Sequence, residues 1–134
     1  MDIFVTILAA GFSLFTAFAF VKAGKFKATA AREVLLQAGF GWVEKLPFGV
    51  VRLIAWLELA GSAGLILAPI GFFLGYSWAI WFAVAAGIGL ALTMAVAIII
   101  HAARNETKYT LKMNLQLLVV SAISAGAWAY LPSL

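Results

Sequence analysis

Four stretches of the chain are almost entirely apolar, and short polar segments separate them. They span Ile3–Val21, Phe48–Ala68, Ser77–Ile100 and Leu111–Leu131. A transmembrane helix needs about 20 mostly apolar residues, so each stretch can cross a bilayer. The pattern predicts an all-α fold, a four-helix transmembrane bundle in which residues 1–134 form a single membrane domain.

The ends of the stretches carry residues typical of helix termini. Pro47 suits the start of the second helix, and Pro69 is expected to end it at Ala68. Ser77 and Thr110 are predicted to cap the third and fourth helices.

The segment between the first two spans, residues 22–47, is too long for a minimal turn. Its part Ala28–Ala38 places Val34 and Leu35 on one helical side and leaves Arg32 available for water. This pattern predicts a short interfacial helix on the membrane surface, with an irregular loop as the alternative.

Composition supports a membrane protein. Hydrophobic residues make up 66% of the chain and charged residues 10%, whereas soluble domains average roughly 45–50% and about 25%. The chain has no cysteine, which excludes a disulfide-stapled secreted module. The first span has Asp2 before it and lysines after it, the reverse of a signal peptide, so we expect a retained helix.

The basic residues gather on one side of the predicted membrane, and the other side carries Asp2. The positive-inside rule therefore predicts both termini outside and the basic loops in the cytoplasm. There the basic residues fit anionic lipids of the bilayer better than nucleic acid. They are Lys22, Lys25, Lys27, Arg32, Lys45, Arg52, Arg104, Lys108 and Lys112.

Aromatic and small residues predict how the bundle sits and packs. Aromatic belts are expected at the outer interface (Tyr76, Trp78, Trp81, Trp128, Tyr130) and the inner one (Phe26, Trp42, Tyr109). Small residues spaced by four predict close helix packing, within one chain or in a homo-oligomer. These stripes are Ala9-Ser13-Ala17, Ala60-Gly64-Ala68, Ala83-Gly87-Ala91 and Ser121-Ala125-Ala129.

Glu58 is the ionisable residue that most needs a partner. It lies ten residues after Phe48, about 15 Å along a helix and thus near the predicted bilayer centre. A carboxylate there costs several kcal/mol unless it is neutralised, paired or hydrated. Arg52 is the nearest basic residue on the same predicted helix, but it is about 120° away around the helix, so a direct pair is poor. Glu58 is either a ligand or proton site, or a protonated group that ties helices together.

Other polar residues are predicted to line an inward-opening cavity around Glu58. Matching of depths places Ser13, Ser121 and Ser124 level with Glu58 and Ser62 one turn above it. The other polar residues are predicted to lie nearer the cytoplasm. His101 and Arg52 also have simpler interpretations, as a headgroup-level or capping histidine and as an arginine that reaches the lipid headgroups. The candidate ligand-binding residues besides Glu58 are Ser13, Thr16, Arg52, Ser62, Thr93, His101, Asn114, Gln116, Ser121 and Ser124.

Several chemistries are excluded by what the sequence lacks. With one histidine and no cysteine, no metal site, haem or iron–sulfur cluster is expected. No nucleotide-binding glycine motif follows a strand. No constellation of catalytic residues points to a stand-alone enzyme, so no catalytic residue is assigned.

Three segments carry a resemblance to the DoxX-like family of small four-helix membrane proteins: FVKAGKF (Phe20–Phe26), RLIAWLELAGSAGLILAP (Arg52–Pro69) and AAGIGLALTMAVAIIIHAARNE (Ala85–Glu106). Glu58 resembles the family's in-membrane glutamate, and His101 the histidine that closes its third helix. The resemblance implies a bacterial inner-membrane protein. The family includes a small membrane subunit of a thiosulfate:quinone oxidoreductase, partners of oxidative-stress proteins and distant relatives that assist receptor assembly.

Two main hypotheses follow, and a third ranks below them. The first is an accessory membrane subunit, with a membrane or peripheral redox partner, that binds a quinone- or isoprenoid-like molecule around Glu58. The second is an assembly or chaperone-like protein without a bound ligand. A small proton-coupled transporter ranks last, because transporters usually carry repeats and more spans.

Overall fold

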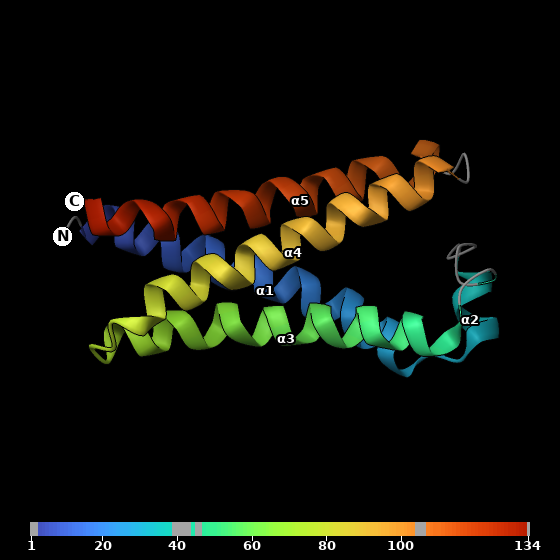
Figure 1. Ribbon diagram of the computed structural model, residues 1–134, viewed down its shortest axis with the longest axis horizontal. Helices are drawn as coiled ribbons and strands as arrows, with labels where there is room; N and C mark the ends of the chain where they lie inside the picture. The colour runs from blue at the N-terminus through green and yellow to red at the C-terminus, as the bar shows by residue number, and fades with distance from the viewer. Residues whose placement is uncertain (1–2, 39–43, 45–46, 104–106, 134) are drawn as a thin grey trace.

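The computed structural model describes residues 3–38, 44, 47–103 and 107–133, without the side chains of residues 107–110 and 133. Four long helices form an elongated bundle (Figure 1). Helix α1 packs against α3 and α5, and α4 also packs against α3 and α5. The helices are α1 (Ile3–Thr29), α2 (Arg32–Gln37), α3 (Phe48–Phe73), α4 (Trp78–Ala103) and α5 (Thr107–Tyr130), followed by the 3-10 turn η2 (Leu131–Ser133).

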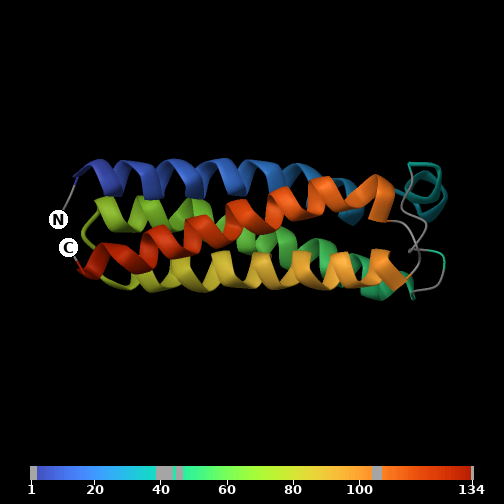
Figure 2. The same cartoon turned by 90° about the horizontal axis from the view of Figure 1, so that it is seen from above.

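This architecture confirms the predicted all-α bundle with a short helix between the first two spans. The four long helices are each long and apolar enough to cross a membrane. Both chain ends lie at one end of the bundle and α2 lies at the other (Figures 1 and 2). Helix α2 covers residues 32–37, the middle of the expected segment.

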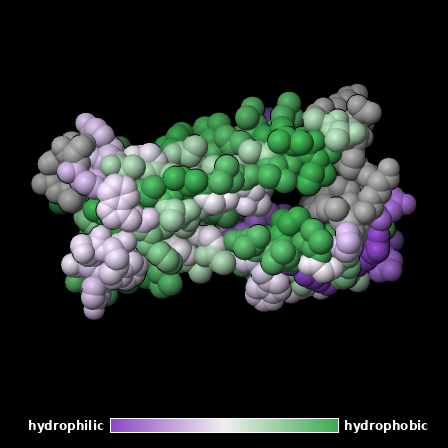
Figure 3. Space-filling model, in the orientation of Figure 1, coloured by the Kyte–Doolittle hydropathy of each residue, from purple (hydrophilic) through white to green (hydrophobic). Residues whose placement is uncertain are grey.

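The face of the bundle in Figure 3 is largely apolar between its two ends and most hydrophilic near α2. Large apolar side chains such as Phe18 and Ile99 are mostly exposed, as lipid-facing groups would be. We call the end that carries α2 the basic end. The described basic side chains there are Lys22, Lys25, Lys27, Arg32, Arg52 and Lys112; Lys45 and the side chains of Arg104 and Lys108 lie outside the described residues.

The first helix is longer than predicted. It continues past Val21 to Thr29 and includes three lysines that the sequence analysis assigned to a loop. Lysine and alanine are good helix formers, and the buried positions recur every seven residues at Thr6, Ser13, Phe20 and Lys27. The interior face of α1 therefore extends to Lys27.

Helix α3 does not end at Pro69, as predicted, but passes through it to Phe73. Proline has no N–H, so the carbonyl of Leu65, four residues earlier, loses its usual helical donor. The hydroxyl of Ser13 on α1 donates to that carbonyl at 2.6 Å, in a buried position. A hydroxyl from a neighbouring helix thus replaces the missing hydrogen bond, which is how membrane helices tolerate proline.

The connection between α3 and α4 is short. Gly75 has a φ of +92°, a conformation that glycine adopts without strain, and the N–H of Tyr76 donates to the carbonyl of Gly71 at 2.9 Å. Helix α4 begins directly after Ser77, and α3 directly after Pro47, as expected. Helix α5 begins at Thr107. Thr110 therefore lies inside the helix and is not its cap.

Small residues bring the helices together. A Cβ placed on Gly87 of α4 would lie 2.9 Å from the Cβ of Ala125 on α5, so only glycine allows this approach. Most of the predicted small-residue positions are buried. Ala60 and Ala129 are exposed and Ala91 is half-buried, because four-residue spacing drifts around a 3.6-residue helix.

Four of the five residues predicted for the outer aromatic belt are exposed. Tyr76, Trp78, Trp81 and Tyr130 are about half exposed at the end opposite α2. The prediction is wrong for Trp128, which is fully buried. Its ring packs edge-on against Phe72, with the ring centroids 5.6 Å apart. At the inner interface Phe26 is partly exposed, and Trp42 and the side chain of Tyr109 lie outside the described residues.

Candidate functional site

The partner of Glu58 is Lys27. The carboxyl group of Glu58 is fully buried on α3, and the Nζ of Lys27 on α1 donates to its Oε1 at 2.6 Å. Gly24, one turn before Lys27, lets the α1 backbone lie against α3: a Cβ there would be 3.2 Å from the carbonyl oxygen of Ala55. The two charged residues thus form a buried ion pair between the first two spans.

Lys27 is not among the predicted site residues, because the apolar pattern predicts that the first helix ends at Val21. The signal was present in the seven-residue repeat of interior positions that leads from Thr6 to Lys27. Three lysines within six residues instead predict a polar segment outside the membrane. Two of them, Lys22 and Lys25, are indeed exposed.

Arg52 holds the end of α1 in place. Its guanidinium donates to the carbonyl oxygens of Lys27 and Ala30, each at 2.8 Å, and lies 4.4 Å from the centre of the Phe48 ring. Carbonyls of the last helical turn lack intrahelical donors, and a cation there is favourable. Arg52 therefore positions the backbone of Lys27, and Lys27 in turn pairs with Glu58.

The ion pair leaves hydrogen-bonding capacity unused. Glu58 Oε2 is buried and has no hydrogen-bond partner among the residues that the structure describes. The lysine ammonium has three N–H donors, one of which engages Oε1. An acceptor and a donor therefore lie side by side in a buried position.

Of the four serines predicted near Glu58, Ser62 lies on its own helix and Ser13 on α1. The hydroxyl of Ser62 donates to the carbonyl of Glu58 at 2.8 Å, one turn along α3. Ser13 bonds to Leu65 instead, seven residues and roughly 10 Å beyond Glu58 toward the chain ends. The predicted match in depth between Ser13 and Glu58 is wrong, because α1 extends further toward the basic end than expected.

The other buried hydroxyls lie on α1 and α5. Ser13, Thr16, Ser121 and Ser124 are fully buried, so these four hydroxyls lie in the bundle interior. Ser121 donates to carbonyls of its own helix. In the described part of the chain, Thr16 Oγ1 and Ser124 Oγ have no hydrogen-bond partner.

Phe20 separates these hydroxyls from the ion pair along α1. It is fully buried and belongs to an apolar cluster with Leu65, Leu90 and Met94. The predicted site residues thus form two groups: one at the basic end around the ion pair, and one of hydroxyls further along the bundle.

The remaining predicted residues have separate environments. Thr93 is half-buried and bonds to the carbonyl of Gly89 on its own helix, and Gln116 is exposed on α5. His101 is buried at the basic end of α4. Asn114 is also buried, and its Nδ2 has no hydrogen-bond partner among the side chains and backbone that the structure describes.

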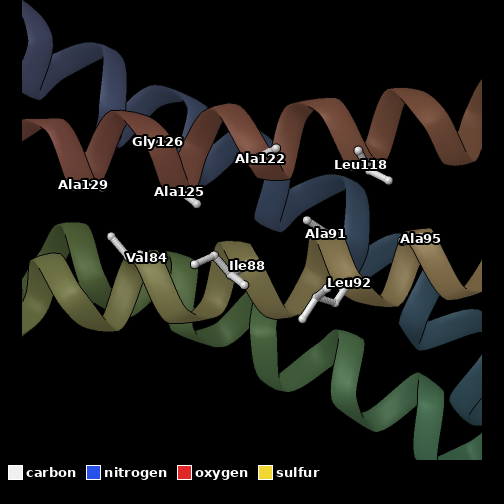
Figure 4. Close-up of a pocket in the computed structure, with 10 residues that line it drawn as sticks. All are labelled: Val84, Ile88, Ala91, Leu92, Ala95, Leu118, Ala122, Ala125, Gly126 and Ala129. Atoms are coloured by element: carbon white, nitrogen blue, oxygen red, sulfur yellow. The ribbon is translucent and has the colours of Figure 1, made fainter.

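Two grooves run along the outer surface of the bundle. One, of about 480 Å³ between α4 and α5, is lined by alanines, Gly126 and aliphatic side chains (Figure 4). The other, of about 460 Å³ between α1 and α5, is lined by Phe15, Ala19, Met113, Gln116, Leu117 and Val120. Glu58 lines neither groove. Figure 3 shows hydrophilic residues at the bottom of a hollow between α3 and α4, in the half nearer α2.

Comparison with known proteins identifies a family. Residues 11–124 match the DoxX-like family, which covers all four long helices in large part. None of the curated proteins matches the chain, and neither does any solved structure. The part of the chain that the structure describes holds no group of three His, Cys, Asp or Glu side chains placed to bind a metal ion.

Proposed function

Since the chain belongs to the DoxX-like family and has four membrane-spanning helices, we propose that it is an accessory membrane subunit that binds a hydrophobic small molecule, quinone- or isoprenoid-like. The polar head of this molecule binds at the Lys27–Glu58 pair. The observation that supports the proposal is Glu58 Oε2, a buried carboxylate oxygen without a partner beside a lysine ammonium. Buried polar groups without partners are rare and point to a bound molecule or water.

The pair can recognise a quinone-type head in both of its redox forms. The carbonyl of an oxidised head accepts a hydrogen bond from Lys27, and the hydroxyl of a reduced head donates one to Glu58 Oε2. The hydroxyl of an isoprenoid alcohol donates to Glu58 Oε2 and makes no contact with Lys27. Ligand sites typically combine apolar walls with a few polar groups of this kind. We expect the apolar tail to reach the lipid between α3 and α4, where the surface is hollowed (Figure 3).

The ligand is expected to bind more weakly when the hydrogen-bond acceptor, the carboxyl group of Glu58, is removed. Loss of a hydrogen bond to a charged group costs about 1.5–3 kcal/mol, so Glu58→Leu should weaken binding by roughly tenfold to a hundredfold. The matched control is Ser62→Ala, which removes a buried hydroxyl one turn away and should keep the ligand.

The measurement is the ligand-to-protein ratio after gentle purification, by mass spectrometry of the extracted small molecules. A Glu58→Leu protein that keeps its ligand in full would end the proposal. A protein that carries no small molecule, but recovers one membrane partner in proportion to folded chain, would favour the assembly function instead.

We also propose that the protein lies in a bacterial inner membrane with both chain ends outside, because the basic end then faces the cytoplasm. The chain has no cysteine, so single cysteines report on sidedness directly. In intact cells an impermeant thiol reagent should label Ser77→Cys, which is exposed opposite α2, and spare Glu44→Cys at the basic end. The reverse labelling pattern would show that the basic end faces outward and would contradict the proposed orientation.

A further inference from the structure

The groove between α1 and α5 combines apolar walls with an amide. Phe15, Ala19 and Val120 form part of its walls, and Gln116 lines it as well. Gln116 is exposed on the lipid-facing surface, where an amide without a hydrogen-bond partner is unfavourable. Its place in the groove therefore favours an occupant that has both an apolar chain and a hydrogen-bonding group.

Two lysines lie at the basic end of this groove. Lys22 follows Phe15 by seven residues, so it lies on the same side of α1, one turn beyond Ala19. Lys112 precedes Gln116 by one turn on α5. Both lysine side chains are exposed.

The two lysines are close in depth. Ala9 packs in one cluster with Trp128, and Phe20 packs in another with Leu117 and Leu118, so α1 and α5 run antiparallel. Continuing this alignment places Lys22 between the levels of Lys112 and Gln116. Positive charge therefore flanks the groove on both helices at the basic end.

The groove between α4 and α5 offers a contrast. Its ten lining residues are all apolar, from Val84 to Ala129 (Figure 4). Nothing in that lining selects one lipid or partner over another. The α1–α5 groove differs because Gln116 lines it and Lys22 and Lys112 flank it. These groups can bind a polar, negatively charged headgroup.

We propose that the α1–α5 groove is a binding site for an anionic phospholipid. One acyl chain lies along Phe15, Ala19 and Val120, and the phosphate lies between the ammonium groups of Lys22 and Lys112. Gln116 donates to an ester oxygen of the lipid. Basic pockets between membrane helices on the cytoplasmic side bind anionic headgroups in this way. The site is separate from the Lys27–Glu58 pair and does not depend on the function proposed for it.

The test compares two lipids with the same acyl chains, phosphatidylglycerol and phosphatidylcholine, titrated into delipidated protein and counted by native mass spectrometry. Wild-type protein is expected to prefer phosphatidylglycerol by roughly tenfold to thirtyfold, from two lysines near an anionic headgroup. The double variant Lys22→Gln/Lys112→Gln should lose this preference. Lys25→Gln, an exposed lysine on an adjacent face of α1, should keep it.

Two further variants separate the parts of the site. Ala19→Leu fills the groove and should weaken binding of both lipids, since it acts on the chain and not on the headgroup. Ala91→Leu fills the groove between α4 and α5 instead and should leave the preference unchanged, because the two grooves are distinct. Equal binding of both lipids by wild-type protein, or a preference that survives in the double variant, would overturn the proposal.

Discussion

Replacing Lys27 with methionine is expected to lower the free energy of unfolding by about 3–5 kcal/mol, as for other buried pairs that lose one partner. The substitution keeps the length of the side chain but leaves the Glu58 carboxyl buried with neither oxygen paired. Thermal unfolding in detergent, or unfolding titrated with a denaturing detergent, measures the loss.

A second variant shows whether the loss comes from the unpaired charge. Lys27→Met/Glu58→Leu removes both charges, and buried ion pairs replaced by apolar groups are often neutral or stabilising, so most of the lost stability should return. Lys25→Met is the matched control, an exposed lysine on the same helix, and should change stability by less than about 0.5 kcal/mol. A double variant as unstable as Lys27→Met would show that Lys27 acts through packing and not through Glu58.

Glu58→Leu alone should be milder than Lys27→Met. Lysine has a long stem and lies near the basic end of the bundle, so its ammonium can reach the headgroup region when its partner is removed. A glutamate on the interior face of α3 has no such route. This asymmetry makes Glu58→Leu the better variant for ligand binding and Lys27→Met the better one for stability.

Replacing Ser13 with alanine is the second change with a large expected effect. It should cost about 1–3 kcal/mol, because the buried carbonyl of Leu65 then loses the donor that replaces the missing N–H of Pro69. Ser62→Ala is the control: its hydroxyl also bonds a buried carbonyl, that of Glu58, but this carbonyl keeps its helical N–H donor. The control should be nearly neutral.

The link between Ser13 and Pro69 is tested by a double-mutant cycle. Pro69→Ala restores a backbone donor to Leu65, so Ser13→Ala should cost much less in that background, with an interaction energy of about 1 kcal/mol or more. Measured unfolding free energies of the four proteins give this value. Additive effects would mean that the hydroxyl and the proline act independently.

The order of the helices could be read from the sequence because it depends on local composition. Four apolar runs of membrane length, separated by polar segments, leave few alternatives in a bilayer, since backbone groups there must bond within a helix. Local composition also shows that the basic residues lie on one side, and that small residues such as Gly87 allow close packing. The family resemblance around Glu58 can be read from the sequence for the same reason.

The helix ends and the pairing at the site were decided by tertiary structure. Pro69 reads as a helix end in isolation, but Ser13 on another helix supplies the missing hydrogen bond and lets α3 continue. Taken alone, Lys27 is predicted to lie in a loop. In the structure α1 is longer, and Lys27 therefore reaches the buried carboxylate of Glu58 on α3. The sequence by itself determined that Glu58 needs a partner, because the cost of burying a charge is local. Which residue meets that need depended on how α1 and α3 are aligned, and this alignment is set by Gly24 and the packing along the whole interface.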